Sequence, residues 1–177
     1  VHRGDEDVMV MTQLGCMAEE CVAPAISCVK IDENIPLTSA ALIGCGVMTG
    51  VGAALNAANV QKGTTAVIFG CGGIGLSTIQ GARIAGAKNV VAVDTLPAKL
   101  DMAKTFGATH GCLLEDASEF ILELTEGRGA DYWFEAVGNS APMPQAEACT
   151  RPAGVCTVNG DGKMDEQVGL SPFRVAV

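Results

Sequence analysis

The chain has 177 residues, of which 49% are hydrophobic and 22 are glycine, while aromatic residues make up only 4%. This composition excludes a disordered chain and favours tight glycine turns over an aromatic-rich β-sandwich. The formal net charge of −9 argues against partners that need a basic patch, which are nucleic acid and anionic membrane surfaces. The eight cysteines include no Cys-x-x-Cys pair, so we expect reduced thiols and a cytoplasmic protein.

Residues 1–36 are polar and irregular, with two short β-favouring runs. These runs cover residues 17–23 and 26–31 and are separated by Pro24. Because β-favouring runs bounded by a proline are typical of short strands, the sequence predicts two strands ahead of residue 36.

A stretch without charged residues follows, from residue 34 to residue 61. Within it, residues 37–44 and 47–58 predict two short helices. Gly46 and Gly50 have the spacing of small residues in membrane helix dimers. However, Pro36, four glycines and several amide side chains keep the stretch below the hydrophobicity of a spanning segment. The sequence therefore predicts no membrane span.

From residue 64 the sequence alternates between strand and helix patterns. Apolar, β-branched runs predict strands at 64–70, 88–94, 110–115, 130–138 and 154–160. The segments between them predict helices at 73–86, 97–107, 117–127 and 142–151. Since nearly continuous apolar strands are buried on both faces, they indicate a parallel sheet covered by helices. We therefore expect a doubly wound α/β fold.

The sharpest motif is Gly70-Cys-Gly72-Gly-Ile-Gly75, which lies between the first of these strands and the next helix. In this context GxGxxG binds the pyrophosphate of a dinucleotide. Gly70 permits the tight turn, Gly72 lets the backbone approach the pyrophosphate, and Gly75 lets the helix pack closely on the strand. The helix N-terminus offers unpaired amides and a partial positive charge, so an anionic ligand is compatible with a net charge of −9.

Asp94 ends the following strand, about 20 residues after Gly75, which is the spacing expected for a ribose-binding acid. Its carboxylate would accept hydrogen bonds from the adenosine ribose and repel a 2′-phosphate. The sequence therefore predicts NAD in preference to NADP. The alternative is an ordinary solvated aspartate at a strand end.

Three segments, 41–55, 66–94 and 103–110, together resemble the zinc-dependent medium-chain alcohol dehydrogenases. The resemblance extends from about Met17 to Gly160. It implies an NAD-binding, Rossmann-type domain at residues 45–177, truncated at its C-terminal end before a final strand. Residues 1–44 resemble a short remnant of the GroES-like β domain with its connecting helix. The chain thus looks like a fragment of a two-domain enzyme.

The resemblance also implies roles for individual residues. Thr49 resembles the residue that packs against the nicotinamide, and Lys99 a second partner of the ribose beside Asp94. Lys99 equally fits an ordinary solvated helix charge. Asn159, like Val137, resembles a position that lines the cofactor cleft, although the family pattern has an apolar residue there. The remaining residues assigned to the cofactor are Gly70, Gly72, Gly73, Ile74, Gly75 and Val137.

Cys45 resembles the third ligand of the catalytic zinc, which alcohol dehydrogenase binds through a Cys₂His set. A thiolate is a soft ligand, and the glycines on either side would let a metal come close. Without the resemblance, Cys45 would fit a small buried hydrophobe. His2 and His110 do not have ligand spacing from Cys45, so we expect the remaining zinc ligands to lie outside this chain.

The function implied by the resemblance is NAD-dependent, zinc-dependent oxidation of an alcohol to an aldehyde or ketone, with this fragment inactive alone. A dehydrogenase of S-(hydroxymethyl)glutathione is the alternative within the family. Two hypotheses from different classes are a non-catalytic dinucleotide-binding module and an interaction protein with an unpaired sheet edge. The expected partners are a small-molecule alcohol or aldehyde and, in the full-length enzyme, further copies of the same subunit.

Overall fold

The computed structural model describes residues 2–9, 18–163, 165 and 167–169. The chain divides into two compact units, Val1–Ala40 and Ala41–Val177. The first unit contains two short antiparallel strands, β1 (His2–Arg3) and β2 (Glu6–Asp7), and a 3₁₀ turn, η2 (Ala25–Ser27). The second unit contains a helix-covered sheet, which carries the sequence motifs described above.

The strands predicted at 17–23 and 26–31 are wrong for residues 18–23 and 26–31; residue 17 lies outside the described residues. Residues 25–27 form η2 instead, with the Ser27 N–H donating to the Pro24 carbonyl at 2.9 Å. A β-favouring run forms a strand only where a neighbouring strand accepts its backbone hydrogen bonds. No such neighbour exists for these runs within the described residues.

The two helices predicted between residues 37 and 58 form one continuous helical run, Leu37–Ala57. It consists of α1 (Leu37–Leu42), a π-helical turn η3 (Ile43–Val47), α2 (Met48–Gly52) and a second π-helical turn η4 (Ala53–Ala57). The predicted break at residues 45–46 is wrong, because glycine lowers helix stability by only about 1 kcal/mol and does not remove a hydrogen bond.

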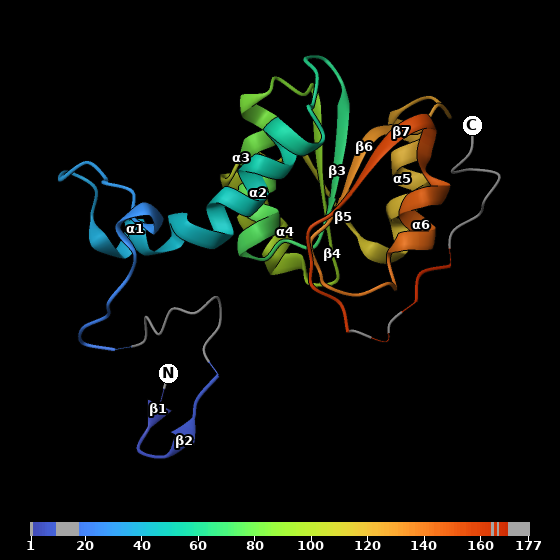
Figure 1. Cartoon of the computed structure of the whole chain (residues 1–177). Helices are drawn as coiled ribbons and strands as arrows, with labels where there is room; N and C mark the ends of the chain where they lie inside the picture. Colours follow the sequence, from blue (N-terminus) through green and yellow to red (C-terminus); the bar gives the residue numbers. More distant parts are fainter. Residues whose placement is uncertain (1, 10–17, 164, 166, 170–177) are drawn as a thin grey trace. The chain divides into compact units, whose positions relative to one another are not determined.

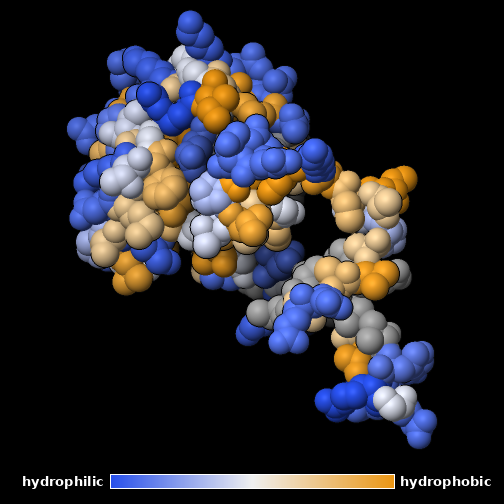
Figure 2. Space-filling model, turned by 90° about the vertical axis from the view of Figure 1, so that its left-hand side faces the viewer, coloured by the Kyte–Doolittle hydropathy of each residue, from blue (hydrophilic) through white to orange (hydrophobic). Residues whose placement is uncertain are grey.

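This helical run has a mean hydropathy of 1.6, and 17% of its most apolar 18-residue stretch is buried inside the protein. By length and composition alone it could cross a membrane. Its exposed apolar side chains include Leu37, Leu42 and Met48. On the face drawn in Figure 2, apolar residues reach the surface in several patches bordered by hydrophilic ones.

The second unit is built on a parallel sheet that, within the described residues, has five strands in the order β5-β4-β3-β6-β7 (Figure 1). The strands are β3 (Thr65–Phe69), β4 (Asn89–Asp94), β5 (His110–Leu113), β6 (Ala130–Glu135) and β7 (Thr150–Val158). The helices α3 (Gly73–Ile84), α4 (Pro97–Thr105), α5 (Ala117–Leu124) and α6 (Met143–Ala148) connect them. The predicted doubly wound α/β fold is confirmed.

The ends of these elements differ from the predictions by a few residues, most clearly at β7. This strand begins at Thr150, whereas the sequence predicted residue 154, and it contains Pro152 and a left-handed Ala153 with φ +57°. A register shift opposite Ala130 and Tyr132 accommodates the irregularity. Proline is tolerated on an edge strand because its missing N–H interrupts no ladder there.

Two hydrophobic clusters fill the two faces of the sheet. One joins the π-helical turn η4 and the inward faces of α3 and α4 to the sheet through residues such as Ala54 and Ile79, and the other joins α5 and α6 to it through residues such as Ile121. Figure 1 shows α3 and α4 on one side of the sheet and α5 and α6 on the other. The strand order reverses direction at β3, because the chain moves from β3 to β4 and β5 and later returns to β6. Such a switch point opens a crevice at the carboxyl ends of the strands.

Candidate functional site

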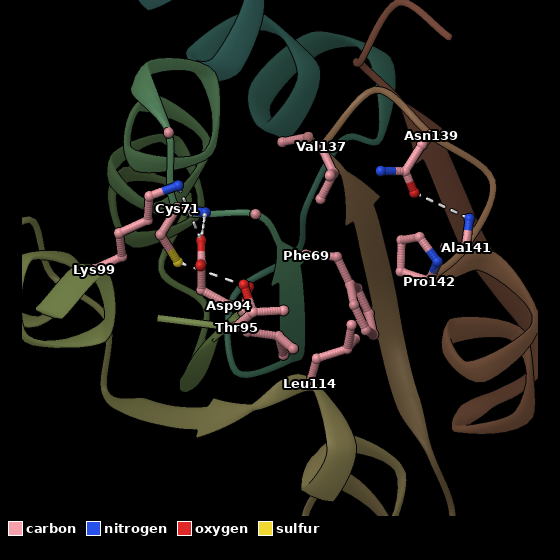
Figure 3. Close-up of a pocket in the computed structure, with 14 residues that line it drawn as sticks. Phe69, Cys71, Asp94, Thr95, Lys99, Leu114, Val137, Asn139, Ala141 and Pro142 are labelled. Atoms are coloured by element: carbon pink, nitrogen blue, oxygen red, sulfur yellow. Dashed lines mark hydrogen bonds and ion pairs between the residues drawn. The ribbon is translucent and has the colours of Figure 1, made fainter. Parts of the chain in front are cut away.

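A cleft of about 530 Å³ lies at this switch point, at the carboxyl ends of β3, β4 and β6. Figure 3 shows Asp94 and Lys99 on one wall and Val137 and Asn139 on the opposite wall. The side chains and backbone that line it are Phe69, Gly70, Cys71, Gly72, Val93, Asp94, Thr95, Lys99, Leu114, Ala136, Val137, Asn139, Ala141 and Pro142. Loops that follow neighbouring parallel strands therefore enclose one shared space.

Two glycines of the motif are required by the packing of the protein itself. Gly70 has a left-handed φ of +94°, and a Cβ there would lie 2.9 Å from the Ala136 carbonyl oxygen and 2.8 Å from a Val137 methyl group. A Cβ on Gly75 would overlap the Gly70 carbonyl oxygen. These two positions press α3 and the loop after β6 against the end of β3, which fixes the shape of the turn.

The packing of the protein does not require glycine at the other two positions of the motif, Gly72 and Gly73. A Cβ on Gly72 or Gly73 would meet nothing within 4 Å, and Gly72 has an ordinary φ of −79°. Helix α3 begins at Gly73, and the Leu76 N–H donates the first helical hydrogen bond, to the Gly72 carbonyl at 2.8 Å. The amides ahead of Leu76 therefore precede the helical ladder, with open space where side chains would otherwise stand. Unpaired amides at a helix N-terminus favour an anion such as a phosphate group.

Asp94 is 8% exposed, so it is not an ordinary solvated aspartate at a strand end. One carboxylate oxygen accepts the Cys71 N–H at 2.9 Å, and the other accepts the Leu96 N–H at 3.1 Å. The Lys99 ammonium lies 3.7 Å from the oxygen that Cys71 also contacts. Because a carboxylate has about four acceptor positions, Asp94 keeps acceptor capacity on the wall of the cleft.

Cys71 is a cleft residue that the sequence did not identify, because the second position of GxGxxG carries no residue preference. Its thiol is 2% exposed and contacts the Val93 carbonyl oxygen at 3.8 Å. Burial, with the nearby Asp94 carboxylate, raises the pKa of the Cys71 thiol to about 12. The thiol is therefore neutral at physiological pH. The seven cysteines in the described part of the chain are free thiols, as the sequence predicted.

The sequence also missed Thr95, Leu114, Asn139, Ala141 and Pro142. All of them immediately follow a strand or lie in the loop after one. Since ligands of open α/β sheets bind outside the carboxyl ends of the strands, strand ends were the signal that could have found them.

The remaining predicted cofactor residues lie in different places. Val137 lines the cleft and is 50% exposed. Ile74 and Gly75 lie in the first turn of α3 and are not among the cleft-lining residues. Asn159 follows β7 and also does not line the cleft; its N–H donates to the Glu135 carbonyl at 2.8 Å. Contact of each predicted residue with a cofactor, including those that line the cleft, stays a prediction.

Cys45 is exposed in the π-helical turn η3, and Thr49 is half-buried on α2; neither lines the cleft. Helix α2 nevertheless packs directly on α3, because a Cβ on Gly50 would overlap the Ile74 carbonyl oxygen and contact Ser77. Thr49 is thus carried beside the helix whose N-terminus forms the glycine turn. Short π-helical turns occur frequently at functional sites.

The residues that the structure describes do not form a zinc site. Within the described residues, no three His, Cys, Asp or Glu side chains come together in a group that could hold a metal ion. Since tetrahedral zinc needs at least three protein ligands, Cys45 alone does not hold it.

A parallel sheet with a switch-point cleft, an open glycine turn at a helix N-terminus and an anchored strand-end aspartate defines a dinucleotide-binding α/β domain. Comparison with protein families shows which family of such domains this is: the family described as zinc-binding dehydrogenase matches residues 73–177. The chain belongs to this family.

Curated relatives agree with this assignment. Alcohol dehydrogenase-like 7 of Arabidopsis thaliana is 41% identical over 176 residues, covering 96% of this chain and 45% of the relative. The S-(hydroxymethyl)glutathione dehydrogenase of Saccharomyces cerevisiae is 39% identical over 178 residues, covering 96% of this chain and 46% of the relative. The chain therefore spans about half the length of the curated relatives it matches.

Solved structures show the same fold. An alcohol dehydrogenase zinc-binding domain protein from Burkholderia ambifaria matches with a TM-score of 0.79 and 33% identity, covering 84% of this chain and 40% of that protein. A zinc-binding dehydrogenase from Sinorhizobium meliloti 1021, solved bound to NADP, matches with a TM-score of 0.66 and 25% identity. The match covers 75% of this chain and 40% of that protein. The family and these neighbours support NAD(P) and zinc as cofactors of such proteins.

Proposed function

We propose that this chain is the coenzyme-binding part of an NAD-dependent, zinc-dependent alcohol dehydrogenase, an enzyme that oxidises a small alcohol to an aldehyde or ketone. The observation that supports this most strongly is the open glycine turn. Space at Gly72 and Gly73 is left free at the N-terminus of α3, although the protein's own packing does not require glycine there. A ligand that brings a diphosphate to the helix N-terminus explains both residues.

The pyrophosphate, the adenosine ribose and the nicotinamide half of NAD can be assigned to the start of α3 and to the two walls of the cleft. The amides of Gly72, Gly73, Ile74 and Gly75 would hold the pyrophosphate, and Asp94 with Lys99 would hold the adenosine ribose. The nicotinamide half would then extend towards Val137 on the opposite wall. The buried Asp94 carboxylate disfavours the 2′-phosphate of NADP, because two negative charges would meet in a partly desolvated cleft. Bound NAD would supply the hydride acceptor, while the protein binds and orients it.

Zinc belongs to the proposed enzyme, but its site does not form within the described residues. We assign Cys45 to one ligand position because the residues around it resemble the family pattern. The other ligands would come from outside this chain. Thr49 is proposed to pack against the nicotinamide, because α2 is fixed against α3 by the contact at Gly50. The proposed domain division remains 1–44 for the catalytic-domain remnant and 45–177 for the coenzyme domain.

One relative favours a second candidate substrate. The yeast protein that is 39% identical to this chain is an S-(hydroxymethyl)glutathione dehydrogenase, so a hydroxymethyl thiol adduct is the alternative to a simple alcohol. For the complete enzyme we further propose a cytoplasmic location and a homo-oligomeric state. A non-catalytic dinucleotide-binding role for this chain by itself is compatible with the same cleft.

Titration of the purified chain with NADH, followed by nicotinamide fluorescence, tests the proposal. We expect saturable binding of NADH and at least tenfold weaker binding of NADPH, since charge repulsion at one site is worth about 1.4 kcal/mol or more. The control is an Asp101→Ala variant, which removes an exposed carboxylate on α4 and leaves the cleft unchanged. Absence of NADH binding would favour an interaction protein instead. Alcohol oxidation by this chain alone, above a metal-free blank, would contradict the assignment of the zinc ligands to other segments.

A further inference from the structure

Glu135, the last residue of β6, is a fully buried carboxylate that the proposed function does not use. It is only 1% exposed. One of its carboxylate oxygens accepts two backbone hydrogen bonds, from Val137 at 2.6 Å and from Gly138 at 2.7 Å. The other accepts the Gly160 N–H at 3.3 Å. Within the described residues it forms no ion pair, so three amides of two different loops are its hydrogen-bond partners.

These hydrogen bonds join two loops that are far apart in the sequence. The loop of residues 136–138 follows β6, and Gly160 follows β7. The two loops are pressed together: a Cβ on Gly160 would overlap the Gly138 nitrogen and lie 2.7 Å from the Glu135 carboxylate. Gly138 itself has a left-handed φ of +84°. The backbone is therefore shaped around the carboxylate.

The loop held by Glu135 forms one wall of the cleft. Ala136 and Val137 both line it, and both approach Gly70, the first residue of the glycine turn. Figure 3 shows Val137 on the wall opposite Asp94 and Lys99. With the adenosine ribose at Asp94 and the diphosphate at the start of α3, the second half of a dinucleotide extends to this wall.

Holding a loop through a buried carboxylate carries a free-energy cost, because burying a charge without a cation is unfavourable. A carboxylate is also the side chain that can accept all three hydrogen bonds. A glutamine keeps one acceptor oxygen for Val137 and Gly138 but turns an NH₂ group towards the Gly160 N–H. The wall therefore depends on a side chain that offers an acceptor on both of its oxygens.

We propose that Glu135 is a positioning residue for the nicotinamide ring of the cofactor. It acts through the Ala136–Val137 backbone, which it holds at the distance from the glycine turn that the nicotinamide ring requires. This inference rests on the proposed function, that the cleft binds a nicotinamide dinucleotide.

The test compares two ligands that differ only in the nicotinamide: NADH and ADP-ribose. Calorimetric titrations of both are made with the parent chain, Glu135→Gln, Glu135→Ala and the control Glu123→Ala, which removes an exposed carboxylate on α5. We expect about tenfold weaker NADH binding in Glu135→Ala, an intermediate loss in Glu135→Gln, and less than about threefold change for ADP-ribose. The control should bind both ligands like the parent.

Equal weakening of NADH and ADP-ribose would overturn the inference, because Glu135 would then serve the fold alone. Unchanged NADH binding in both variants would overturn it as well. If the parent chain bound neither ligand, the proposed function itself would fail. Circular dichroism and thermal unfolding identify a variant that does not fold, and in that case Glu135→Gln, which preserves shape and two of the three hydrogen bonds, decides between the outcomes.

Discussion

Two buried aspartates differ in how many partners their carboxylates have. Asp131, at the start of β6, accepts hydrogen bonds from Arg128 at 2.7 and 3.0 Å, from Arg151 at 2.7 Å and from the Thr65 N–H at 2.8 Å. Its carboxylate is fully used. Asp94 accepts only two backbone hydrogen bonds and has one lysine at 3.7 Å. Its remaining capacity is available to a ligand.

Asp131→Ala should lower the free energy of unfolding by about 2 to 3 kcal/mol at pH 7, because two arginines and a buried amide lose their acceptor. The hydrogen bond from Arg128, with those from Thr65 and Arg151, holds the pKa of the Asp131 carboxyl well below its usual range. A lowered pKa gives stability that is fully present above the unfolded pKa of about 3.9 and is lost as the pH falls below it. Urea unfolding at pH 7 and pH 3 measures both effects.

In that experiment the difference between parent and variant should shrink at pH 3. Asp101→Ala is the control, since the exposed pair of Asp101 with Lys104 contributes little. Identical urea midpoints of parent and Asp131→Ala at pH 7 would contradict the role assigned to this cluster.

The reactivity of Cys71 should be far below that of Cys45. The Cys71 thiol is buried and its pKa is about 12, whereas Cys45 is exposed. Because only the thiolate is nucleophilic, iodoacetamide at pH 8 should label Cys45 at least about tenfold faster. Mass spectrometry of the two peptides over time gives the rates. Comparable labelling rates would mean that Cys71 readily becomes accessible to solvent, in contradiction to its burial.

At the scale of elements, helix α3 is positioned by glycines that serve opposite purposes. Gly75 and Gly50 let α3 approach β3 and α2 respectively, since a Cβ at either would overlap a carbonyl oxygen. Gly72 and Gly73 instead leave space outside the protein's own packing. One short segment therefore combines glycines that the packing requires with glycines that the proposed ligand would require, and substitutions separate the two.

Gly72→Ala should change ligand binding, whereas Gly75→Ala should change the stability of the fold. Gly72→Ala adds a methyl group to open space, so we expect unfolding within about 0.5 kcal/mol of the parent but at least tenfold weaker NADH binding. Gly75→Ala forces α3 away from the Gly70 carbonyl and should cost about 1 to 3 kcal/mol or more. Chemical denaturation and NADH titration of both variants provide the comparison. Strong binding by Gly72→Ala would mean that no phosphate approaches that position.

Elements whose signal is local could be predicted from the sequence, and those set by long-range contacts could not. The strands of the sheet, the turn at Gly70 and the role of Gly75 follow from apolar runs and glycine spacing. The missing strand at residues 26–31 depends on the absence of a neighbour, which no local pattern shows. The continuity of the helix through Gly46 was missed because glycine weakens a helix without removing a hydrogen bond. The contribution of Glu135 depends on Gly160, which is distant in sequence.

At the scale of the whole molecule, the net charge of −9 and an anionic ligand are reconciled by geometry. The proposed anion site consists of backbone amides at the start of α3, which need no basic side chain to attract an anion. The strand order β5-β4-β3-β6-β7 places this helix N-terminus beside the loops after β4 and β6, so one cleft can hold both halves of a dinucleotide.

Ligands that bind the folded chain should raise its melting temperature, which separates the two proposed cofactors. NADH at 100 times its Kd should stabilise the chain by about 2.7 kcal/mol, or roughly 5 to 10 °C. Equimolar Zn²⁺ should give no comparable shift, because no ligand group forms within the described residues. Differential scanning fluorimetry with each additive is the measurement. A shift with Zn²⁺ that a Cys45→Ser variant abolishes would show that this chain completes a zinc site.

The central claim is that the amides at the start of α3 receive a diphosphate while Asp94 binds the adjacent ribose. The most direct measurement is a two-dimensional ¹⁵N–¹H NMR titration of the labelled chain with NADH, with ADP-ribose as a second ligand. The largest shifts are expected at the amides of Gly72, Gly73, Ile74 and Gly75, followed by those around Asp94, with both ligands. Saturable shifts that leave Gly72–Gly75 unmoved would contradict the claim.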